Sequence, residues 1–449
     1  MTHLILPSIP LMISPPRGLS KLPLVEIDKE KVQTKHKRIL VPKAQRQAEN
    51  CSYGAFGSHP LTFTAWELCH AAKKTELTRS FTAHRANELA FLFAHEHHDR
   101  FIWDTDNLRC ADGSGMWLED FSGKGFSGRI GEALAYLTMT KMWGYAYWDR
   151  IASAWMRAAR NSTIKHAEMV RVARFTGNLT GQSFDIQPDF VFEKPDKTVA
   201  LMEAKGSFVT PGNDRPDAKG PLKHGLDQLA KWTSLITPSP AKSIAIESLL
   251  REASDSCSDP SLILHVDPPA DGTPDMEPVE LHPDAIRRGN FGVWLMGMGF
   301  RNSGLALADR REIGTAEVEL PVVKLNGVDF ALSIQGWRVD QHRFAPFPWW
   351  PFELGHIPRK LWFEFLRDIG VSGVYALGLE VRTLLAACAA LVNPSSNSMM
   401  DLPSIGFGRQ HDSYGPDGFY GSVFPDGSLL GIVSSRYLEQ EVRMEIFSL

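Results

Sequence analysis

The sequence predicts an α/β fold, and three observations support this prediction. Residues 126–270 alternate between helix-like and strand-like segments, as expected for a sheet with helices packed on its faces. Two β-prone runs, 184–192 and 199–205, flank the turn-forming residues Lys194-Pro-Asp-Lys197, so a hairpin is expected there. Helix-like segments precede and follow this hairpin, around 128–135 and over 222–236.

The regions on either side of this segment differ from it in character. Residues 1–50 are expected to form an irregular basic arm, and residues 51–125 a helical N-terminal region whose clearest helix spans 78–101. A polar, proline-rich stretch at 267–275 is a linker candidate. Residues 275–449 are then expected to form an α+β accessory domain of unknown role.

Local patterns predict several elements in this accessory domain. Helices are expected over 285–310 and 374–391. Asn326-Gly327 and Pro425-Asp-Gly427 are strong turn signals, so a hairpin is expected at each. Trp349, Trp350 and Trp362 suggest a second apolar core.

Composition limits the class of protein. The chain has 449 residues, of which 43% are hydrophobic and 22% charged, so it is able to bury more than one core. Its net charge of -4 provides no overall basic field, although a local basic surface remains compatible with it. The five cysteines lack CxxC spacing, and no apolar run approaches about 20 residues, so we expect a cytoplasmic protein without a membrane span.

The hairpin places charged residues in a specific arrangement. If its turn centres on Asp196, paired positions sum to 392, and Asp189 lies directly opposite Glu203. Lys205 follows two residues later on the same face. Opposed carboxylates repel each other, and a protein tolerates them when a cation lies between them. The expected cation is a hard divalent ion, because such ions prefer oxygen ligands.

Pro188-Asp189 followed by Glu203-Ala-Lys205 resembles the signature of the PD-(D/E)XK nuclease superfamily. The resemblance implies a restriction-endonuclease-like core, with a central mixed sheet flanked by helices. It is supported by Gly128-Arg-Ile-Gly-Glu132, where Ser127 is a candidate helix N-cap, and by Gly206-Ser207 directly after Lys205. Gln228 and Trp232 extend it, since they lie on one face of the following helix. The matching elements cover about a quarter of the chain, and no branch of the superfamily is assigned.

The resemblance implies a role for each matching residue. Asp189, Glu203, the carbonyl of Ala204 and Glu132 are expected to hold Mg²⁺ or Mn²⁺. Lys205 is expected to act on the attacking water or the phosphate, and Gln228 to bind the DNA backbone or orient the site. DNA is favoured over RNA as substrate on the habits of the family.

A basic stretch follows at 150–174, and its side chains could contact phosphate groups. A solvated helix face is the alternative interpretation. The residues concerned are Arg150, Arg157, Arg160, Lys165, Arg171 and Arg174.

The function expected from these features is a Mg²⁺-dependent deoxyribonuclease, an endonuclease of prokaryotic restriction or antiviral defence. The alternatives are a recombination, repair or junction-processing nuclease, and a catalytically inactive nucleic-acid-binding module. Residues 275–449 could dock a partner protein or a second copy of the chain. A zinc hydrolase site at His95-Glu-His-His-Asp99 is disfavoured, because the spacing does not place two histidines four residues apart.

Overall fold

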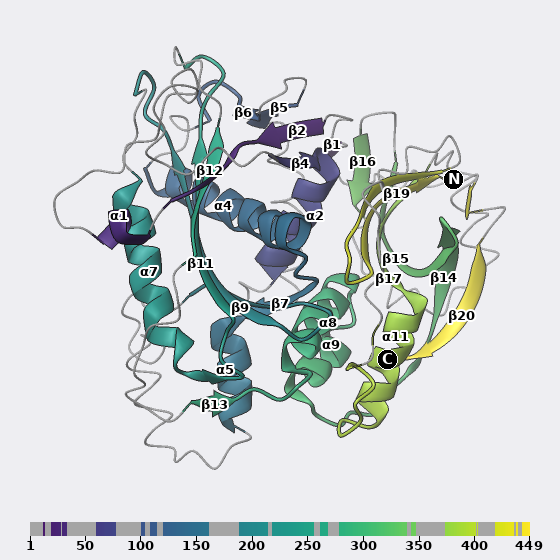
Figure 1. Cartoon of the computed structure of the whole chain (residues 1–449). Coiled ribbons are helices and arrows are strands. Elements are labelled where there is room, and N and C mark those ends of the chain that lie inside the picture. Colours follow the sequence, from purple (N-terminus) through teal and green to yellow (C-terminus); the bar gives the residue numbers. More distant parts are fainter. Residues whose placement is uncertain are drawn as a thin grey trace. The chain divides into compact units, whose positions relative to one another are not determined.

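The structure is a computed structural model of the whole chain (Figure 1). It describes residues 12–13, 19–27, 29–33, 60–77, 100–103, 108–114, 120–160, 188–213, 218–255, 261–267, 278–338, 343–346, 373–400, 402, 418–434, 437–438 and 442–449. Several predictions lie outside these residues: the helix over 78–99 with its histidine cluster, the tryptophans at 349, 350 and 362, and the basic residues Lys165, Arg171 and Arg174.

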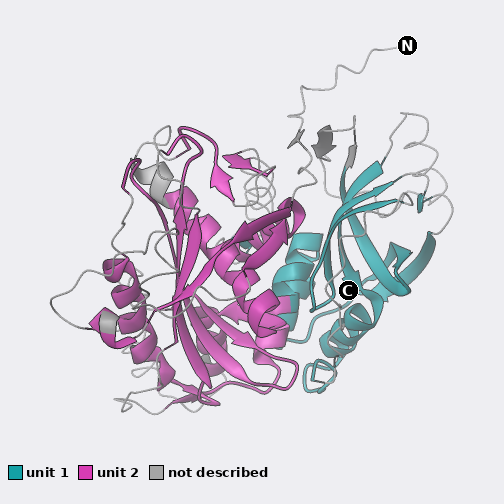
Figure 2. Ribbon diagram, turned by 45° about the horizontal axis from the view of Figure 1, so that its top comes forward, with its two compact units in different colours: residues 1–16, 76–98, 291–449 teal, residues 17–75, 99–290 magenta. Residues whose placement is uncertain are grey.

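The chain divides into two compact units, each assembled from segments that are distant in sequence (Figure 2). Unit 2 comprises residues 17–75 and 99–290, and unit 1 comprises residues 1–16, 76–98 and 291–449. The sequence led us to expect domains made of contiguous stretches of chain, whereas each unit combines two or three separate stretches. The 126–270 segment lies wholly in unit 2.

Unit 2 is built on a mixed six-stranded sheet with the order β3-β12-β11-β9-β8-β7. β9 and β11 run parallel, as do β12 and β3, and the other neighbours run antiparallel. This agrees with the mixed α/β character expected from the sequence. The strands are β3 (Leu24–Glu26), β7 (Tyr147–Arg150), β8 (Phe190–Glu193), β9 (Val199–Phe208), β11 (Lys242–Leu250) and β12 (Leu262–Val266).

Helices α4 (Asp120–Trp143) and α7 (Lys219–Thr233) cover opposite faces of this sheet (Figure 1). Gly131 of α4 packs against Gly206 of β9, whereas Gly225 of α7 packs against Glu203 of the same strand. Positions 203 and 206 differ by an odd number, so their side chains point to opposite faces. The two helices thus enclose β9 from both sides.

Smaller elements complete unit 2. Helices α1 and α5 and three pairs of short strands surround the main sheet, and α2 extends two residues beyond Thr75, where this stretch of the unit ends. They are α1 (Lys29–Gln33), α2 (Ala65–Leu77), α5 (Ile151–Arg160), β2 (Leu19–Leu22) with β4 (Leu61–Thr64), β5 (Phe101–Ile102) with β6 (Arg109–Cys110), and β10 (Ile236–Thr237) with β13 (Val279–Glu280).

The N-terminal region departs from its expectation. Residues 19–33 are not part of an irregular arm, because Leu24–Glu26 adds an edge strand to the main sheet by pairing with β12. Leu24 and Val25 are buried there, so apolar burial outweighs the basic character of the neighbouring residues. Residues 51–125 also contain short strands and not helices alone.

The predicted hairpin is confirmed in place and in register. β8 and β9 pair as Phe190↔Met202 through Glu193↔Val199, so paired positions sum to 392 as expected. The turn closes with Lys197 N donating to Lys194 O, and Lys197 adopts a positive φ of 71°. Local turn chemistry and side-chain alternation were sufficient to fix this register.

Unit 1 contains an antiparallel sheet with the path β1-β16-β15-β17-β19-β18, to which β14 and β20 are joined through β15. Helices α8, α9 and α11 accompany it, the first of which begins in unit 2. The elements are β1 (Met12–Ile13), β14 (Glu317–Leu325), β15 (Val328–Arg338), β16 (Arg343–Pro346), β17 (Gly373–Glu380), β18 (Phe419–Val423), β19 (Ser428–Ser434), β20 (Arg443–Ser448), α8 (Ala285–Met298), α9 (Arg301–Asp309) and α11 (Val381–Val392).

Both predicted hairpins in this unit are confirmed. Asn326 and Gly327 have φ values of 48° and 82° and join β14 to β15. Gly427, with a φ of 85°, lies in the turn between β18 and β19. Each turn requires a positive φ, and the positions concerned are occupied by asparagine or glycine, which adopt a positive φ at little cost.

Two predicted helices of unit 1 are wrong in extent. The helix expected over 285–310 is broken at Gly299, whose φ of 100° ends α8 before α9 begins. The helix expected over 374–391 begins only at Val381, and residues 373–380 form strand β17 between β15 and β19. A short, wholly apolar run fits a buried strand and a buried helix equally well, and its two strand neighbours decide between them.

Among the residues that the structure describes, no helix has both the length and the apolar character needed to cross a bilayer.

Candidate functional site

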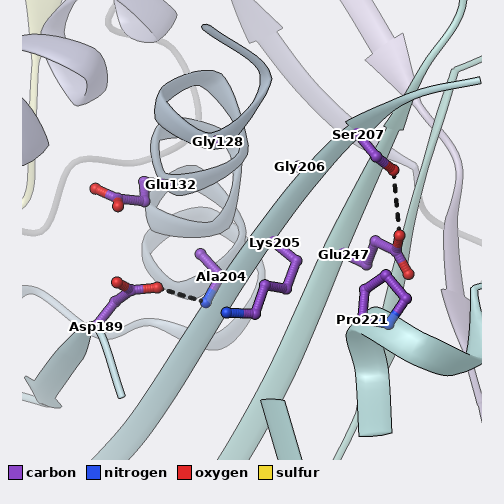
Figure 3. A pocket seen from close by; sticks show the side chains of 9 residues that line it. All are labelled: Gly128, Glu132, Asp189, Ala204, Lys205, Gly206, Ser207, Pro221 and Glu247. Atoms are coloured by element: carbon purple, nitrogen blue, oxygen red, sulfur yellow. Dashed lines mark hydrogen bonds between the residues drawn. The ribbon is translucent and has the colours of Figure 1, made fainter. Parts of the chain in front are cut away.

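The predicted acidic residues meet where β8 and β9 separate. Pairing between these strands ends at Phe190↔Met202, whereas β9 continues to Phe208 alongside β11. A pocket of about 320 Å³ opens at this divergence. It is lined from α4, from the residue before β8, from β9 and β11, and from α7 (Figure 3). Its lining residues are Gly128, Glu132, Asp189, Ala204, Lys205, Gly206, Ser207, Pro221 and Glu247.

Asp189 is fixed to the edge of β9 by two hydrogen bonds. Its own backbone N–H donates to Glu203 Oε2 at 3.0 Å, and its Oδ2 accepts from the Ala204 N–H at 3.0 Å. Both bonds join a backbone N–H to a carboxylate, so they hold Asp189 beside Glu203 and Ala204 just beyond the last ladder pair, Phe190↔Met202. The side chain remains 21% exposed on the pocket side, so Asp189 is both anchored and accessible.

Glu203 and Lys205 lie on the same face of β9, as the alternation predicts. The Lys205 ammonium donates to Glu203 Oε1 in a short ion pair. The two residues differ in exposure, because the Glu203 side chain is 2% exposed and the Lys205 side chain 29% exposed. Lys205 therefore lines the pocket, whereas Glu203 lies beneath it against Gly225. In this arrangement Glu203 holds Asp189 and Lys205 in place and does not itself face the cavity.

Glu132 reaches the pocket because α4 approaches β9 very closely. A Cβ atom on Gly131 would lie 2.8 Å from both the Gly206 Cα and the Lys205 carbonyl oxygen, so a side chain is excluded there. The close contact is formed at Gly131, whereas Gly128 has open space and only lines the pocket. Ser127 is not an N-cap, because α4 begins seven residues earlier, at Asp120.

Burial and neighbouring carboxylates raise the pKa of Asp189 and of Glu203. The pKa of Asp189 is raised mainly because burial disfavours its charged form, and the Glu132 carboxylate adds to this effect. The pKa of Glu203 is raised well above its ordinary value by burial first and by the Asp189 carboxylate second. Both carboxylates would therefore gain from an additional positive charge nearby.

Arg150 supplies part of that positive charge. Its Nη2 donates to Glu132 Oε2 at 2.7 Å and its Nη1 to Asp189 Oδ1 at 3.4 Å. Its guanidinium carbon lies 4.4 Å from the centre of the Phe190 ring, and the side chain is 18% exposed. The structure places Arg150 at the end of β7 and among the acids, and not on a solvent-facing helix surface as expected.

The remaining basic residues of the 150–174 stretch form no such surface among the described residues. Arg157 lies on α5 but is paired with the buried Asp149. Arg160 is the last residue of α5, and the structure describes its backbone and not its side chain. The predicted phosphate contacts of these residues therefore remain predictions.

Gln228 is buried on α7 and is not among the residues that line the pocket. Trp232, four residues later, is also buried, with its ring centroid 6.3 Å from that of Trp155. The two residues share a helix face as expected, but this face is packed into the unit. The helix itself spans Lys219–Thr233, three residues earlier at each end than predicted.

Glu247 is a pocket residue that the sequence reasoning missed. It lies on β11 beside Lys205 in the parallel register, is 1% exposed, and accepts a hydrogen bond from Ser207 Oγ at 3.2 Å. The available signal was a lone acid in an otherwise apolar strand, Ile244-Ala-Ile-Glu247. Its distance of 42 residues from Lys205 in sequence gave no reason to place it beside the motif.

The residues of the site suit a hard divalent cation in chemistry and in charge. The donors are carboxylate and carbonyl oxygens, and the formal charges of the acids exceed those of the bases by two. The charged residues are the acids Glu132, Asp189, Glu203 and Glu247 and the bases Arg150 and Lys205. The described residues contain no group of three or more His, Cys, Asp or Glu side chains positioned to hold a metal ion.

Comparisons with known proteins returned no match: no family model, no curated protein and no solved structure is similar to the chain.

Proposed function

We propose that unit 2 is a divalent-cation-dependent nuclease that hydrolyses DNA phosphodiester bonds. The observation that carries this proposal is the convergence of Glu132, Asp189 and Lys205 on one pocket, with Glu203 directly beneath them. Glu132 comes from α4, Asp189 directly precedes β8 and Lys205 lies on β9, so the fold brings these residues together. An acid pair with an adjacent lysine suits phosphoryl chemistry.

The residues would share the chemistry as follows. Glu132, Asp189 and the Ala204 carbonyl would hold Mg²⁺ or Mn²⁺, which would activate water and neutralise charge on the scissile phosphate. Lys205 would orient the attacking water or donate to a phosphate oxygen, and Glu203 would keep the ammonium at that position. Hydrolysis forms one bond from the water oxygen to phosphorus, breaks one phosphorus–ester bond and leaves a proton on the departing oxygen.

We assign the activity to an endonuclease of prokaryotic restriction or antiviral defence, with recombination, repair or junction processing as the other setting. Unit 1 would then dock a partner protein, a second copy or DNA. These assignments rest on the resemblance of the motif and on analogy in domain organisation.

A specific observation favours one further candidate, a nucleic-acid-binding module without catalysis. Arg150 already binds the two acids that would hold the cation. In such a module these ion pairs would be permanent, and no divalent ion would bind.

The deciding experiment compares variants of the purified full-length protein on circular, linear and single-stranded DNA and on RNA, with and without Mg²⁺. Asp189→Asn and Lys205→Ala should each reduce Mg²⁺-dependent DNA cleavage by about a thousandfold or more while preserving the circular dichroism spectrum. Lys242→Ala is the matched control, since this lysine lies at the far end of β11 and should retain full activity. Undiminished cleavage by either site variant would refute the nuclease assignment.

A further inference from the structure

The side chain of Arg150 joins two acidic residues that come from separate elements. Glu132 lies within α4 and Asp189 directly before β8, and the guanidinium donates to one oxygen of each. Arg150 is itself held in position, because it pairs with Phe190 in the β7–β8 register and lies over that residue's ring. It also donates to the Thr75 carbonyl oxygen at 3.4 Å.

Arg150 binds Glu132 Oε2 and Asp189 Oδ1, which are oxygens of the two carboxylates that would hold the proposed divalent cation. A guanidinium and a metal ion cannot both occupy the same lone pairs of Glu132 Oε2 and Asp189 Oδ1. The two cations would also repel each other at such short range, more strongly in a partly buried site than in water.

We propose that Arg150 is an exchangeable internal counter-ion that holds Glu132 and Asp189 together and is displaced when a divalent cation binds. This inference rests on the proposed function, which supplies the cation. Arg150 stabilises the acids in the metal-free protein, and its departure sets the apparent affinity for the metal. The predicted contact of Arg150 with a phosphate then requires this displacement to occur first.

A permanent structural ion pair gives different expectations from an exchangeable one. If Arg150 is a fixed brace, its removal destabilises the protein equally with and without metal and leaves metal affinity unchanged or weaker. If it is exchanged, its removal strengthens metal binding, and the loss of stability disappears once metal is present. Linkage between binding and folding makes both quantities measurable without any cleavage assay.

The test is calorimetric titration of the full-length protein with Mn²⁺ and Mg²⁺ in the absence of nucleic acid, combined with thermal unfolding in EDTA and in saturating metal. Arg150→Ala should bind metal about tenfold more tightly than the wild type, as expected when one charge-assisted contact no longer competes. It should unfold at a lower temperature than the wild type in EDTA and at the same temperature in metal. Arg150→Lys keeps the positive charge without the forked geometry of the guanidinium. Its metal affinity and its unfolding temperature in EDTA should therefore lie between those of the wild type and of Arg150→Ala.

Arg157→Ala is the matched control, because Arg157 also pairs with a buried acid, but that acid, Asp149, is not among the residues that line the pocket. It should unfold earlier in EDTA and in metal alike, with wild-type metal affinity. Unchanged or weaker metal binding by Arg150→Ala would overturn the exchange while leaving the nuclease assignment intact. Failure of both the wild type and Arg150→Ala to bind any divalent ion would overturn both proposals together.

Discussion

The sheets of the two units both bury acidic residues, but they do so in different ways. In unit 1, Glu380 accepts hydrogen bonds from Thr383 N and Oγ1 at the start of α11. Asp426 accepts hydrogen bonds from Ser428 N and Oγ in the β18–β19 turn. The surrounding core is apolar, with Phe330, Leu332, Val374, Phe419 and Leu429 at its centre.

At the candidate site of unit 2 the buried acids lie beside one another. Burial raises the pKa of Glu203 and of Asp189, and a neighbouring carboxylate adds to each shift, Asp189 for Glu203 and Glu132 for Asp189. Local backbone donors satisfy the acids of unit 1, because helix caps and turns present N–H groups to them. The acids at the candidate site of unit 2 have no comparable local explanation, and this difference supports the proposal that unit 2 carries the chemistry.

Alanine substitutions of glycines at close backbone contacts should have the largest effect on stability, and they test the comparison of the two units most directly. An alanine Cβ at position 206 would overlap the carbonyl oxygen of Ser127, which is backbone and cannot move aside alone. Gly206→Ala should destabilise unit 2 by about 5 kcal/mol or more and abolish metal binding, as measured by urea unfolding and calorimetry. Gly421→Ala creates a similar overlap with Leu430 in unit 1 and should destabilise that unit with metal binding retained.

Gly128→Ala is the control within the same helix, because a Cβ there meets no atom within 4 Å. It should preserve stability or raise it slightly, since alanine favours helix over glycine by about 1 kcal/mol. If Gly206→Ala were as stable as the wild type, the close approach of α4 to β9 would be refuted.

The buried Lys73 gives a smaller effect that depends on pH. Lys73 of α2 is fully buried in unit 2, and burial lowers its pKa to about 7, whereas no described lysine of unit 1 is buried. Between pH 7 and its unfolded pKa of about 10.4, the unfolded chain binds more protons, so stability should rise with pH across this window. Lys73→Met should therefore stabilise the protein by about 4 kcal/mol at pH 6, and the gain should vanish near pH 10.

The measurement is urea unfolding of the wild type and of Lys73→Met at pH 6 and at pH 10. The quantity of interest is the difference in free energy of unfolding between the two proteins at each pH. A stabilisation of the same size at both pH values would mean that the charge of Lys73 is not responsible.

Glu247→Gln carries the smallest expected effect. The amide keeps the shape of the side chain and its hydrogen bond from Ser207 but removes one of the three acidic charges that line the pocket. Metal affinity measured by calorimetry should fall by less than about tenfold, because Asp189 and Glu132 remain. A loss of a hundredfold or more would instead make Glu247 a direct ligand and would shift the cation toward β11.

Local sequence was a good guide wherever a short segment contained all the relevant information. The 189–205 hairpin, its register and the glycine turns at Asn326-Gly327 and Gly427 were all predictable, because turn residues and alternation act over a few positions. The same reasoning was misleading for 374–391, where strand neighbours decided the structure of an apolar run.

The amino-acid sequence by itself determined that Asp189, Glu203 and Lys205 would meet, since a tight hairpin leaves two neighbouring strands no other register. Tertiary structure alone decided which groups surround them. It brought Arg150 from β7 to the acids Glu132 and Asp189 and Glu247 from β11 to the pocket, and it packed Gly225 of α7 against Glu203. Such contacts join residues far apart in sequence, and their partners are selected by the packing of whole helices and strands, which no local pattern encodes.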